Sequence, residues 1–389
     1  MRPSSELLEA LRAAPDAAAV LDALAPVSGV WVVGGAVRDV LLDREPRELD
    51  VVVEGDPAAA LDALGGTAVA HDRFGTATVR PAHGRELDVV RARSESYPAP
   101  GALPEVRPGT LQEDLARRDV TVNAIALRVG GGPPELREVP GAREDLRTGL
   151  LRVMHDASFV DDPTRLWRVA RYASRLGFTV EPRTAALAAN ADPGTVSGPR
   201  LGNELRLALR EPDPLDVLRR ARELNAGLLP ESLTLTPPRL RDALALLPPD
   251  GRRDLVILAA CAETMGAGEV VRWLDDLAFP AGDRDIVAAG SREMVRTPLR
   301  VASTNAEIGR AARGVPIEIV ALAGGDNARR WIEELRHVRP AITGEDLLAA
   351  GIPQGPELGA RLARALDARL DDRAVGREAE LAVALEDER

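Results

Sequence analysis

The sequence predicts an α+β protein in which a small mixed sheet near the N-terminus is followed by a long all-α region. Strand-like apolar runs gather between residues 29 and 130. From about Asp145 onward they give way to apolar residues at helical spacing, as in Leu166–Leu176. Aromatic residues make up only 3% of the chain, so the core must consist mainly of Leu, Val, Ala and Ile, which suits helix packing. A length of 389 residues is enough for two or three domains.

The elements follow one another in a recognisable order. Residues 5–24 have the pattern of one or two amphipathic helices. The strand-like runs are VWVVGG, ELDVVVEG, TATVRP, ELDVVRAR and TVNAIALRV, with helical patterns between them at 36–44 and 56–64. GGGPP at 130–134 marks a break, and proline-rich pieces at 211–215, 235–239 and 247–250 separate the later helices.

Composition excludes several classes of protein. The net charge of −11 does not fit a nonspecific nucleic-acid binder, although a local arginine-lined cleft can still bind RNA. The chain contains no lysine, so all of its basic side chains apart from histidine are arginine. Cys261 is the sole cysteine, which excludes an intrachain disulfide and a cysteine-rich zinc site. No apolar run approaches the ~18 residues of a membrane helix, so we expect a cytoplasmic protein with no membrane segment.

The most informative stretch is Val30–Gly55. An apolar strand reaches Gly34 and Gly35, and a helix carrying Arg38 follows. Paired glycines before a helix let backbone N–H groups approach a phosphate, although this pair lacks the rest of a Walker or GxGxxG motif. The next strand carries Glu48 and Asp50, and their spacing of two places both carboxylates on one face. Together they predict a site for Mg²⁺ beside the phosphate.

Two further segments add charged groups. Asp88 lies on another strand-like run, where a third carboxylate can help to take a proton from an attacking hydroxyl. In EDLARRDVTVNAIAL, from Glu113 to Leu127, Arg118 can clamp a phosphate with its planar fork, and Asn123 can bond a ribose. The plainer alternatives are a water-facing charge at a sheet edge for Asp88 and an ordinary ion pair at a helix end for Arg118.

An arginine stripe follows the sequence DDPTR. Arg165, Arg168, Arg171 and Arg175 recur at steps of three, three and four, which places them on one helix face. Like charges repel, so the stripe should have an anionic partner. The alternative is a solvated face, which is weakened because acidic residues do not alternate with the stripe.

These motifs together resemble those of the class II tRNA nucleotidyltransferase and bacterial poly(A) polymerase family. The resemblance rests on GGAVRD with the following strand, on the RRD segment and on DDPTR. It extends to VSGPRLGNEL, which keeps Arg200 and Glu204 of a neck motif, and to the C-terminal stretch 342–366. The chain departs from the family pattern at Glu48, where the usual residue is aspartate, and at Asp161, where it is glutamate.

The resemblance implies a function and an organisation. A helical segment (1–28) would precede a nucleotidyltransferase head (29–150), a neck (151–210), a body (211–300) and a tRNA-binding tail (301–389). The head would add CCA to the 3′ end of tRNA from CTP and ATP, with Mg²⁺ held by Glu48 and Asp50 and deprotonation assisted by Asp88. Asp162 and Arg165 would read the base. The expected triphosphate ligands are Gly34, Gly35, Arg38, Arg118, Arg168 and Arg171, with Asn123 at the ribose.

Four alternatives remain open at this point. The chain can be an A-adding enzyme, a poly(A) polymerase, or a catalytically weakened RNA-binding protein, which the glutamate at position 48 suggests. A small-molecule adenylyltransferase would not need the arginine stripe or the long helical region. Addition of CC alone is less favoured, because CC-adding members of the family have a short loop where this chain has Arg93–Glu113.

Overall fold

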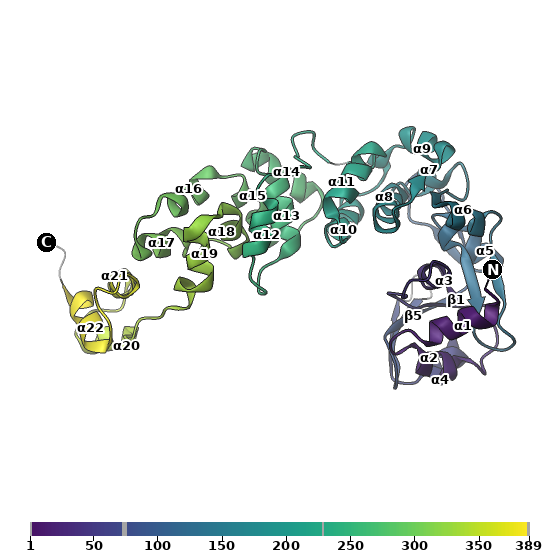
Figure 1. Cartoon of the computed structure of the whole chain (residues 1–389), viewed down its shortest axis with the longest axis horizontal. Helices are drawn as coiled ribbons and strands as arrows, with labels where there is room; N and C mark the ends of the chain where they lie inside the picture. Colours follow the sequence, from purple (N-terminus) through teal and green to yellow (C-terminus); the bar gives the residue numbers. More distant parts are fainter. Residues whose placement is uncertain (1, 72–75, 228, 387–389) are drawn as a thin grey trace. The chain divides into compact units, whose positions relative to one another are not determined.

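The computed structural model describes residues 2–71, 76–227 and 229–386. The chain divides into two compact units (Figure 1). The first comprises Met1–Glu204 with Glu211–Leu228, and the second comprises Leu205–Arg210 with Leu229–Arg389. The finer division into head, neck, body and tail stays a prediction. No helix in the described parts of the chain is both long and apolar enough to cross a bilayer.

A seven-stranded mixed sheet forms the centre of the first unit, in the order β3-β4-β5-β2-β1-β8-β9. Only the β2–β5 pair is parallel. The strands are β1 Val30–Val33, β2 Asp50–Val53, β3 Thr67–His71, β4 Thr76–Arg80, β5 Leu87–Arg91, β8 Ile125–Arg128 and β9 Leu136–Glu138. Every residue of β1 is buried, which explains its unbroken apolar sequence. The predicted α+β class is confirmed.

Short helices accompany this sheet in the first unit. They are α1 Ser4–Arg12, α2 Ala17–Leu24, α3 Gly35–Leu41, α4 Ala58–Leu64, α5 Leu111–Ala116 and α6 Ala142–Thr148. After them come α7 Ser158–Asp161, α8 Thr164–Leu176, α9 Pro182–Ala189 and α11 Pro214–Glu223, while α10 Gly198–Leu209 contributes residues to both units. The two N-terminal helices confirm the pattern seen in residues 5–24.

The sequence prediction was wrong or incomplete at several strands. Glu48 lies two residues before β2 instead of on it, and its side chain is exposed. A separate hairpin of β6 Arg93–Ser96 and β7 Glu105–Pro108 was missed because its arms are polar and partly exposed. β3 and β9 were also missed. The region expected to be all-α contains a parallel pair, β10 Leu150–Leu151 and β11 Thr179–Val180, whose two-residue strands are too short to produce a pattern.

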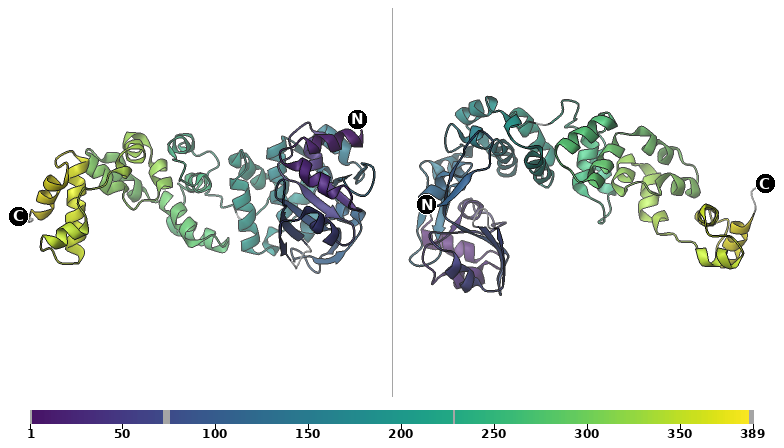
Figure 2. Two further views of the ribbon diagram at one scale, coloured as in Figure 1. Left: turned by 90° about the horizontal axis from the view of Figure 1, so that it is seen from below. Right: turned by 180° about the vertical axis from the view of Figure 1, so that it is seen from behind.

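The second unit contains helices throughout the green and yellow parts of the chain in Figure 2. They are α12 Leu240–Leu246, α13 Arg253–Cys261, α14 Ala267–Asp276, α15 Ala281–Gly290, α16 Glu293–Val301, α17 Asn305–Ala312, α18 Ile317–Ala323, α19 Gly325–Glu333, α20 Gly344–Ala349, α21 Pro356–Leu370 and α22 Arg377–Leu385. Capping boxes begin α17 at Thr304 and α20 at Thr343. The turn between α20 and α21 contains Gly351 and Gly355.

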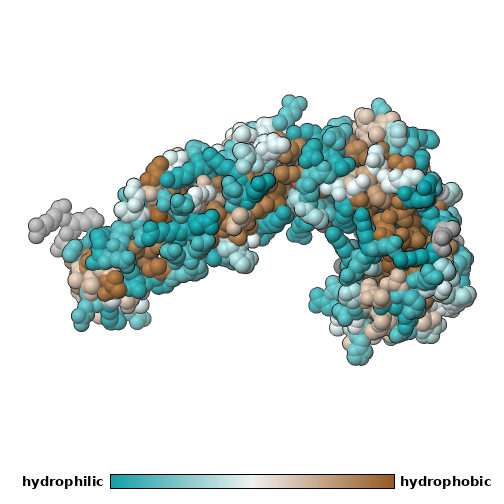
Figure 3. Space-filling model, viewed as in Figure 1, coloured by the Kyte–Doolittle hydropathy of each residue, from teal (hydrophilic) through white to brown (hydrophobic). Residues whose placement is uncertain are grey.

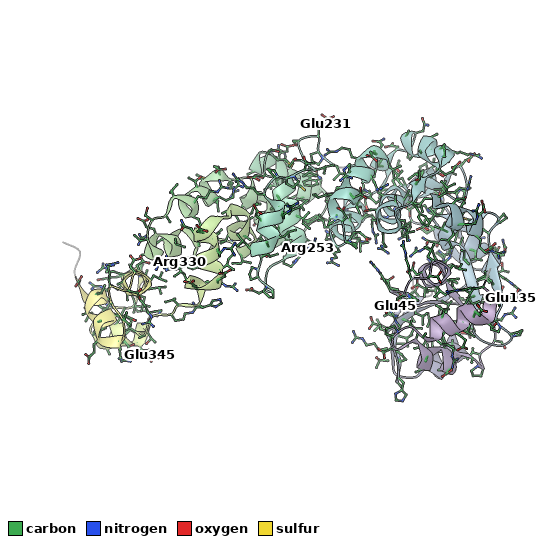
Figure 4. The ribbon with its side chains drawn as sticks, in the orientation of Figure 1. Glu45, Glu135, Glu231, Arg253, Arg330 and Glu345 are labelled. Carbon is green, nitrogen blue, oxygen red and sulfur yellow. The ribbon has the colours of Figure 1, made fainter. Side chains whose placement is uncertain are left out.

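Two clusters of buried aliphatic residues lie in the described part of the second unit, in addition to the buried face of α13. One includes Leu299, Val320 and Leu370, and the other includes Ile342 and Leu347. The face visible in Figure 3 is mainly hydrophilic, with apolar residues in patches. Side chains on the outside of these helices, such as Arg253 at the start of α13 and Arg330 on α19, are labelled in Figure 4.

Candidate active site

A polar cleft of about 570 Å³ lies within the first unit. Ten arginine and seven carboxylate side chains line it, so the cleft carries an excess of positive charge inside an acidic protein. Its walls come from the β1–α3 junction, the loop before β2, the β6–β7 hairpin, and α8 and α10. The loop before β2 begins near Glu45, which Figure 4 labels. Such a cleft suits an anionic ligand.

Gly34 and Arg118 meet at the N-terminal end of α3. Gly34 has a φ of +67°, and a Cβ atom there would lie 2.8 Å from Nη1 of Arg118. The guanidinium therefore covers the glycine at a distance that a side chain would prevent. Nη2 of Arg118 donates to Asp114 at 3.1 Å, whereas its Nε is buried without a partner in the described part of the chain. This geometry leaves Nη1 of Arg118 beside the backbone that follows β1.

The sheet register brings Asp50 and Asp88 together. They are direct partners across the parallel β2–β5 pair, and Thr78 donates to Oδ1 of Asp88 at 2.7 Å. Burial raises the pKa of Asp50, and the charges of Glu48 and Asp88 raise it further, against the opposing effect of Arg118 and Arg168. Asp50 and Glu48 line the cleft, whereas Asp88 is not among its lining residues.

The carboxylates fit a hard divalent cation in their chemistry, although they do not form a complete cage. Within the described residues, no group of three or more His, Cys, Asp or Glu side chains is arranged to hold a metal ion. The pKa of Asp50 is raised first by burial and then by the charges of Glu48 and Asp88, and a bound cation would favour its charged form. Asp50 and Glu48 therefore suit Mg²⁺ with the remaining ligands supplied by water and substrate phosphates.

A chain of hydrogen bonds connects α3 with α8. Arg38, only 3% exposed, donates to Asp39 through Nε and Nη2 and to Oδ1 of Asn123 through Nη1 at 2.6 Å. Asn123 in turn donates to Asp119 at 3.2 Å, and Asp119 accepts from Nε of Arg168 at 2.7 Å. We call these five residues the relay. Because both polar atoms of Asn123 already bond protein groups, its contact with a ribose stays a prediction.

The arginine stripe on α8 has its anionic partners within the protein. Arg168 pairs with Asp119, Arg171 with Glu204 and Glu211, and Arg175 with Glu211. Arg165 is only 4% exposed, so the solvated-face alternative is wrong. Asp119 lies before β8, Glu204 lies on α10 and Glu211 follows α10, so none of these acids is on α8 itself, which explains why no alternation was visible along that helix.

Asp162 and Arg165 stand at the start of α8 with most of their polar atoms occupied. Oδ1 of Asp162 accepts from Thr164 and, at 2.9 Å, from Nη2 of Arg200. Nη1 of Arg165 donates to Oγ of Ser158 at 2.8 Å, and Nη2 donates to the carbonyl oxygen of Arg117 at 2.9 Å. Among the described contacts, Oδ2 of Asp162 and Nε of Arg165 have no hydrogen-bond partner.

Several lining or supporting residues were missed in the sequence. Glu95 lies on β6 and Tyr97 just after it; Tyr97 donates to Glu95 at 3.1 Å, and Nη2 of Arg165 donates to the Tyr97 hydroxyl at 3.3 Å. Tyr172 donates to Asp119 at 2.9 Å, and its burial raises its pKa to about 12. The position of Tyr172 on α8 was an available signal, whereas the contacts of Tyr97 with Arg165 and of Tyr172 with Asp119 join residues far apart in sequence.

Comparisons with known proteins identify relatives of this chain. Residues 30–152 match the family model described as the poly A polymerase head domain. The chain is 34% identical to an A-adding tRNA nucleotidyltransferase of Geobacter sulfurreducens over 92% of its own length, but spans only 45% of that relative. It is 38% identical to a CC-adding tRNA nucleotidyltransferase of Deinococcus radiodurans over 68% of its own length and 75% of that relative.

Solved structures that resemble this chain cover nearly all of its length. One described as a CCA-adding enzyme in complex with CTP has a TM-score of 0.75 and 26% identity, covering 98% of this chain and 97% of that one. A Thermotoga maritima CCA-adding enzyme complexed with tRNA has a TM-score of 0.70 and 26% identity, covering 99% of this chain and 98% of that one. The resemblance seen in the sequence is confirmed: this chain belongs to the tRNA nucleotidyltransferase family.

Proposed function

We propose that this chain adds CCA to the 3′ end of tRNA from CTP and ATP without a nucleic-acid template, in the cytoplasm. The observation that carries the proposal is that Arg118, Asp50 and the Asp162–Arg165 pair line one and the same cleft. These groups supply, in turn, a phosphate ligand, a metal ligand and a polar edge for a base. Solved relatives described as complexes with tRNA, ATP and CTP support the choice of partners.

The proposed reaction transfers a nucleotidyl group. The 3′ hydroxyl of the RNA attacks the α-phosphate of the nucleotide in line, a new P–O bond forms, and pyrophosphate leaves. Asp88 would accept the proton of the attacking hydroxyl, since it is the register partner of Asp50 and only its Oδ1 has a hydrogen bond in the described chain. Mg²⁺ bound by Asp50 and Glu48 would stabilise negative charge on the attacking and leaving oxygens.

The triphosphate would lie along the arginine-rich wall. Arg118 presents Nη1 over Gly34, where a phosphate oxygen can also meet the backbone at the start of α3, which Gly35 opens. Arg168 and Arg171 extend the positive wall from α8. Arg38 is nearly fully buried and bonded to Asp39 and Asn123, so we assign it to holding this end of the cleft through the relay.

Base selection would use the unoccupied atoms of the Asp162–Arg165 pair. Oδ2 of Asp162 is an acceptor, Nε of Arg165 is a planar donor, and neither bonds another described residue. An acceptor beside a donor can imitate a base-pairing edge, which would let the protein take the place of a template. The hydrogen bonds that fix the other atoms of both side chains would keep this edge rigid.

Incorporation of labelled CTP and ATP into a tRNA transcript that lacks CCA tests the proposal. The expected products with Mg²⁺ are two added residues with CTP alone and three with both nucleotides. Addition of one residue with ATP to a transcript that already ends in CC, without addition of C, would instead favour the A-adding alternative, which the Geobacter relative supports. Binding of tRNA without incorporation, in Mg²⁺ and in Mn²⁺, would favour a weakened RNA-binding protein, consistent with the exposed position of Glu48.

A further inference from the structure

An exposed apolar side chain lines the otherwise polar cleft. Leu103 is 41% exposed, and together with Pro104 it forms part of the cleft wall between β6 and β7. Most other lining side chains are charged or polar. The fold buries only part of the Leu103 side chain, and the exposed part gives the charged cleft an apolar surface on which a ligand with an apolar face can pack.

The loop that carries Leu103 is fixed in place at Gly101. The Gly101 N–H donates to the carbonyl of Val160 at 3.0 Å, and its own carbonyl accepts from Nη1 of Arg200 at 2.7 Å. Gly101 has a φ of +69°, and a Cβ there would lie 2.6 Å from the carbonyl oxygen of Thr195. Glycine is therefore required both by conformation and by space, and the loop is docked against the elements around α7 and α10.

The contacts at Gly101 also place the loop beside Asp162 and Arg165, the residues predicted to read the base. Arg200 donates through Nη1 to Gly101 and through Nη2 to Oδ1 of Asp162 at 2.9 Å. One guanidinium thus joins the loop to the carboxylate. At the other end of the loop, the Arg165 guanidinium lies 5.9 Å from the centre of the Tyr97 ring. The loop from Tyr97 to Pro104 therefore borders both members of the Asp162–Arg165 pair.

We propose that Leu103 and Pro104 form an apolar shelf against which the face of the incoming nucleotide's base packs. A nucleobase has polar edges and apolar faces, so it can direct an edge to Asp162 and Arg165 while one face covers Leu103. The arginine-lined wall would hold the triphosphate of the same molecule. Every base has a face of this kind, so the shelf contributes to affinity for CTP and ATP alike without distinguishing them. This inference rests on the proposed function.

Two single substitutions in the full chain separate this shelf from a general surface effect. Leu103→Ala removes most of the apolar contact, whereas Val160→Ala is a matched control. Val160 is 48% exposed and contacts the same loop through its backbone, but it does not line the cleft. Equilibrium binding of CTP and of ATP, measured by calorimetry without RNA, should weaken about fivefold in Leu103→Ala and remain unchanged in Val160→Ala. Leu103→Phe, which restores a large apolar surface, should bind both nucleotides at least as tightly as Leu103.

Binding of a tRNA transcript lacking CCA provides the second arm and should be the same in all of these variants. Equal nucleotide affinity in Leu103→Ala and Val160→Ala would overturn the shelf. Weakened tRNA binding with unchanged nucleotide affinity would also overturn it, because the apolar wall would then serve the RNA end. Nucleotide incorporation by the unsubstituted chain is measured separately, and its absence would refute the proposed function. The shelf is tested only by the affinities for CTP and ATP.

Discussion

Replacing Asp119 by asparagine tests how the two sides of the cleft are held together. Asp119 is 6% exposed and accepts hydrogen bonds from Arg168 (2.7 Å), Tyr172 (2.9 Å), Asn123 (3.2 Å) and the N–H of Val120 (2.9 Å). Burial alone would raise its pKa, but the charge of Arg168 and these hydrogen bonds hold the pKa of Asp119 well below its usual range. The native structure therefore strongly favours the carboxylate.

The size of the effect follows from what Asp119→Asn removes. The charge is lost, and one oxygen that accepts hydrogen bonds becomes an NH₂ group that faces donors. Breaking a fully buried pair costs about 3–5 kcal/mol. The Arg168 side chain is 40% exposed, so water recovers part of this loss, and we expect the free energy of unfolding to fall by about 3 kcal/mol at pH 7. Because the folded-state pKa is depressed, this stabilisation is present above the ordinary pKa of an aspartate, near ~4, and is lost as the pH falls through the folded-state value.

Urea unfolding followed by tryptophan fluorescence measures this difference. Trp167 is a suitable reporter in the first unit, because it is 1% exposed and its indole donates to the carbonyl of Ala226. Glu144→Gln is the matched control, because it also removes one carboxylate charge from an ion pair. Both side chains of that pair, Glu144 and Arg147, are more than half exposed, so the free energy of unfolding should not change resolvably. The reasoning would be refuted if Asp119→Asn lowered the free energy of unfolding no more than the control does. It would also be refuted if the difference between Asp119→Asn and the parent did not become smaller toward acid pH.

Three further substitutions test individual parts of the cleft. Asp50→Asn should abolish incorporation, as EDTA should in the parent, while leaving stability equal or slightly higher because a carboxylate with a raised pKa is lost; substantial residual activity would contradict a metal-binding role. Gly34→Ala should displace the Arg118 guanidinium and raise the KM for CTP and ATP by the same factor, about tenfold, whereas unequal factors would place Arg118 at the base. Arg165→Ala should blur the choice between CTP and ATP more than it weakens tRNA binding, and an unchanged choice of nucleotide would show that other residues read the base.

The parts of the fold that could be predicted are those with a strong local pattern. The valine-rich runs at β1 and β2 appear in the structure because buried central strands need continuous apolar sequence. Glu48 was misplaced because the period of two holds only within a strand, and β2 begins at Asp50. Asp50 and Asp88 were predicted only to lie on two strand-like runs, and their pairing was not predicted, since register depends on the whole sheet.

The contacts that complete the site could not be predicted from the sequence. Glu211 neutralises Arg171 and Arg175 from a position 36 to 40 residues away, and no local pattern specifies such a distance. Gly101 gave no signal either, because a lone glycine in a loop is common. Its importance is apparent only in the structure, where the Thr195 backbone lies too close to Gly101 for a side chain to fit. Long-range packing therefore decides which of the many arginines and glycines contribute to the cleft.

The relay from Asp39 to Arg168 has a consequence for how this protein can change. Each member bonds the next, so altering one side chain leaves its neighbours with unmatched polar atoms, and compensation requires a second change elsewhere in the relay. Substitutions among the residues of the relay should therefore occur in coupled pairs. The aliphatic side chain of Leu103 takes part in no hydrogen bond of the relay, so replacing it leaves the polar groups of the relay matched.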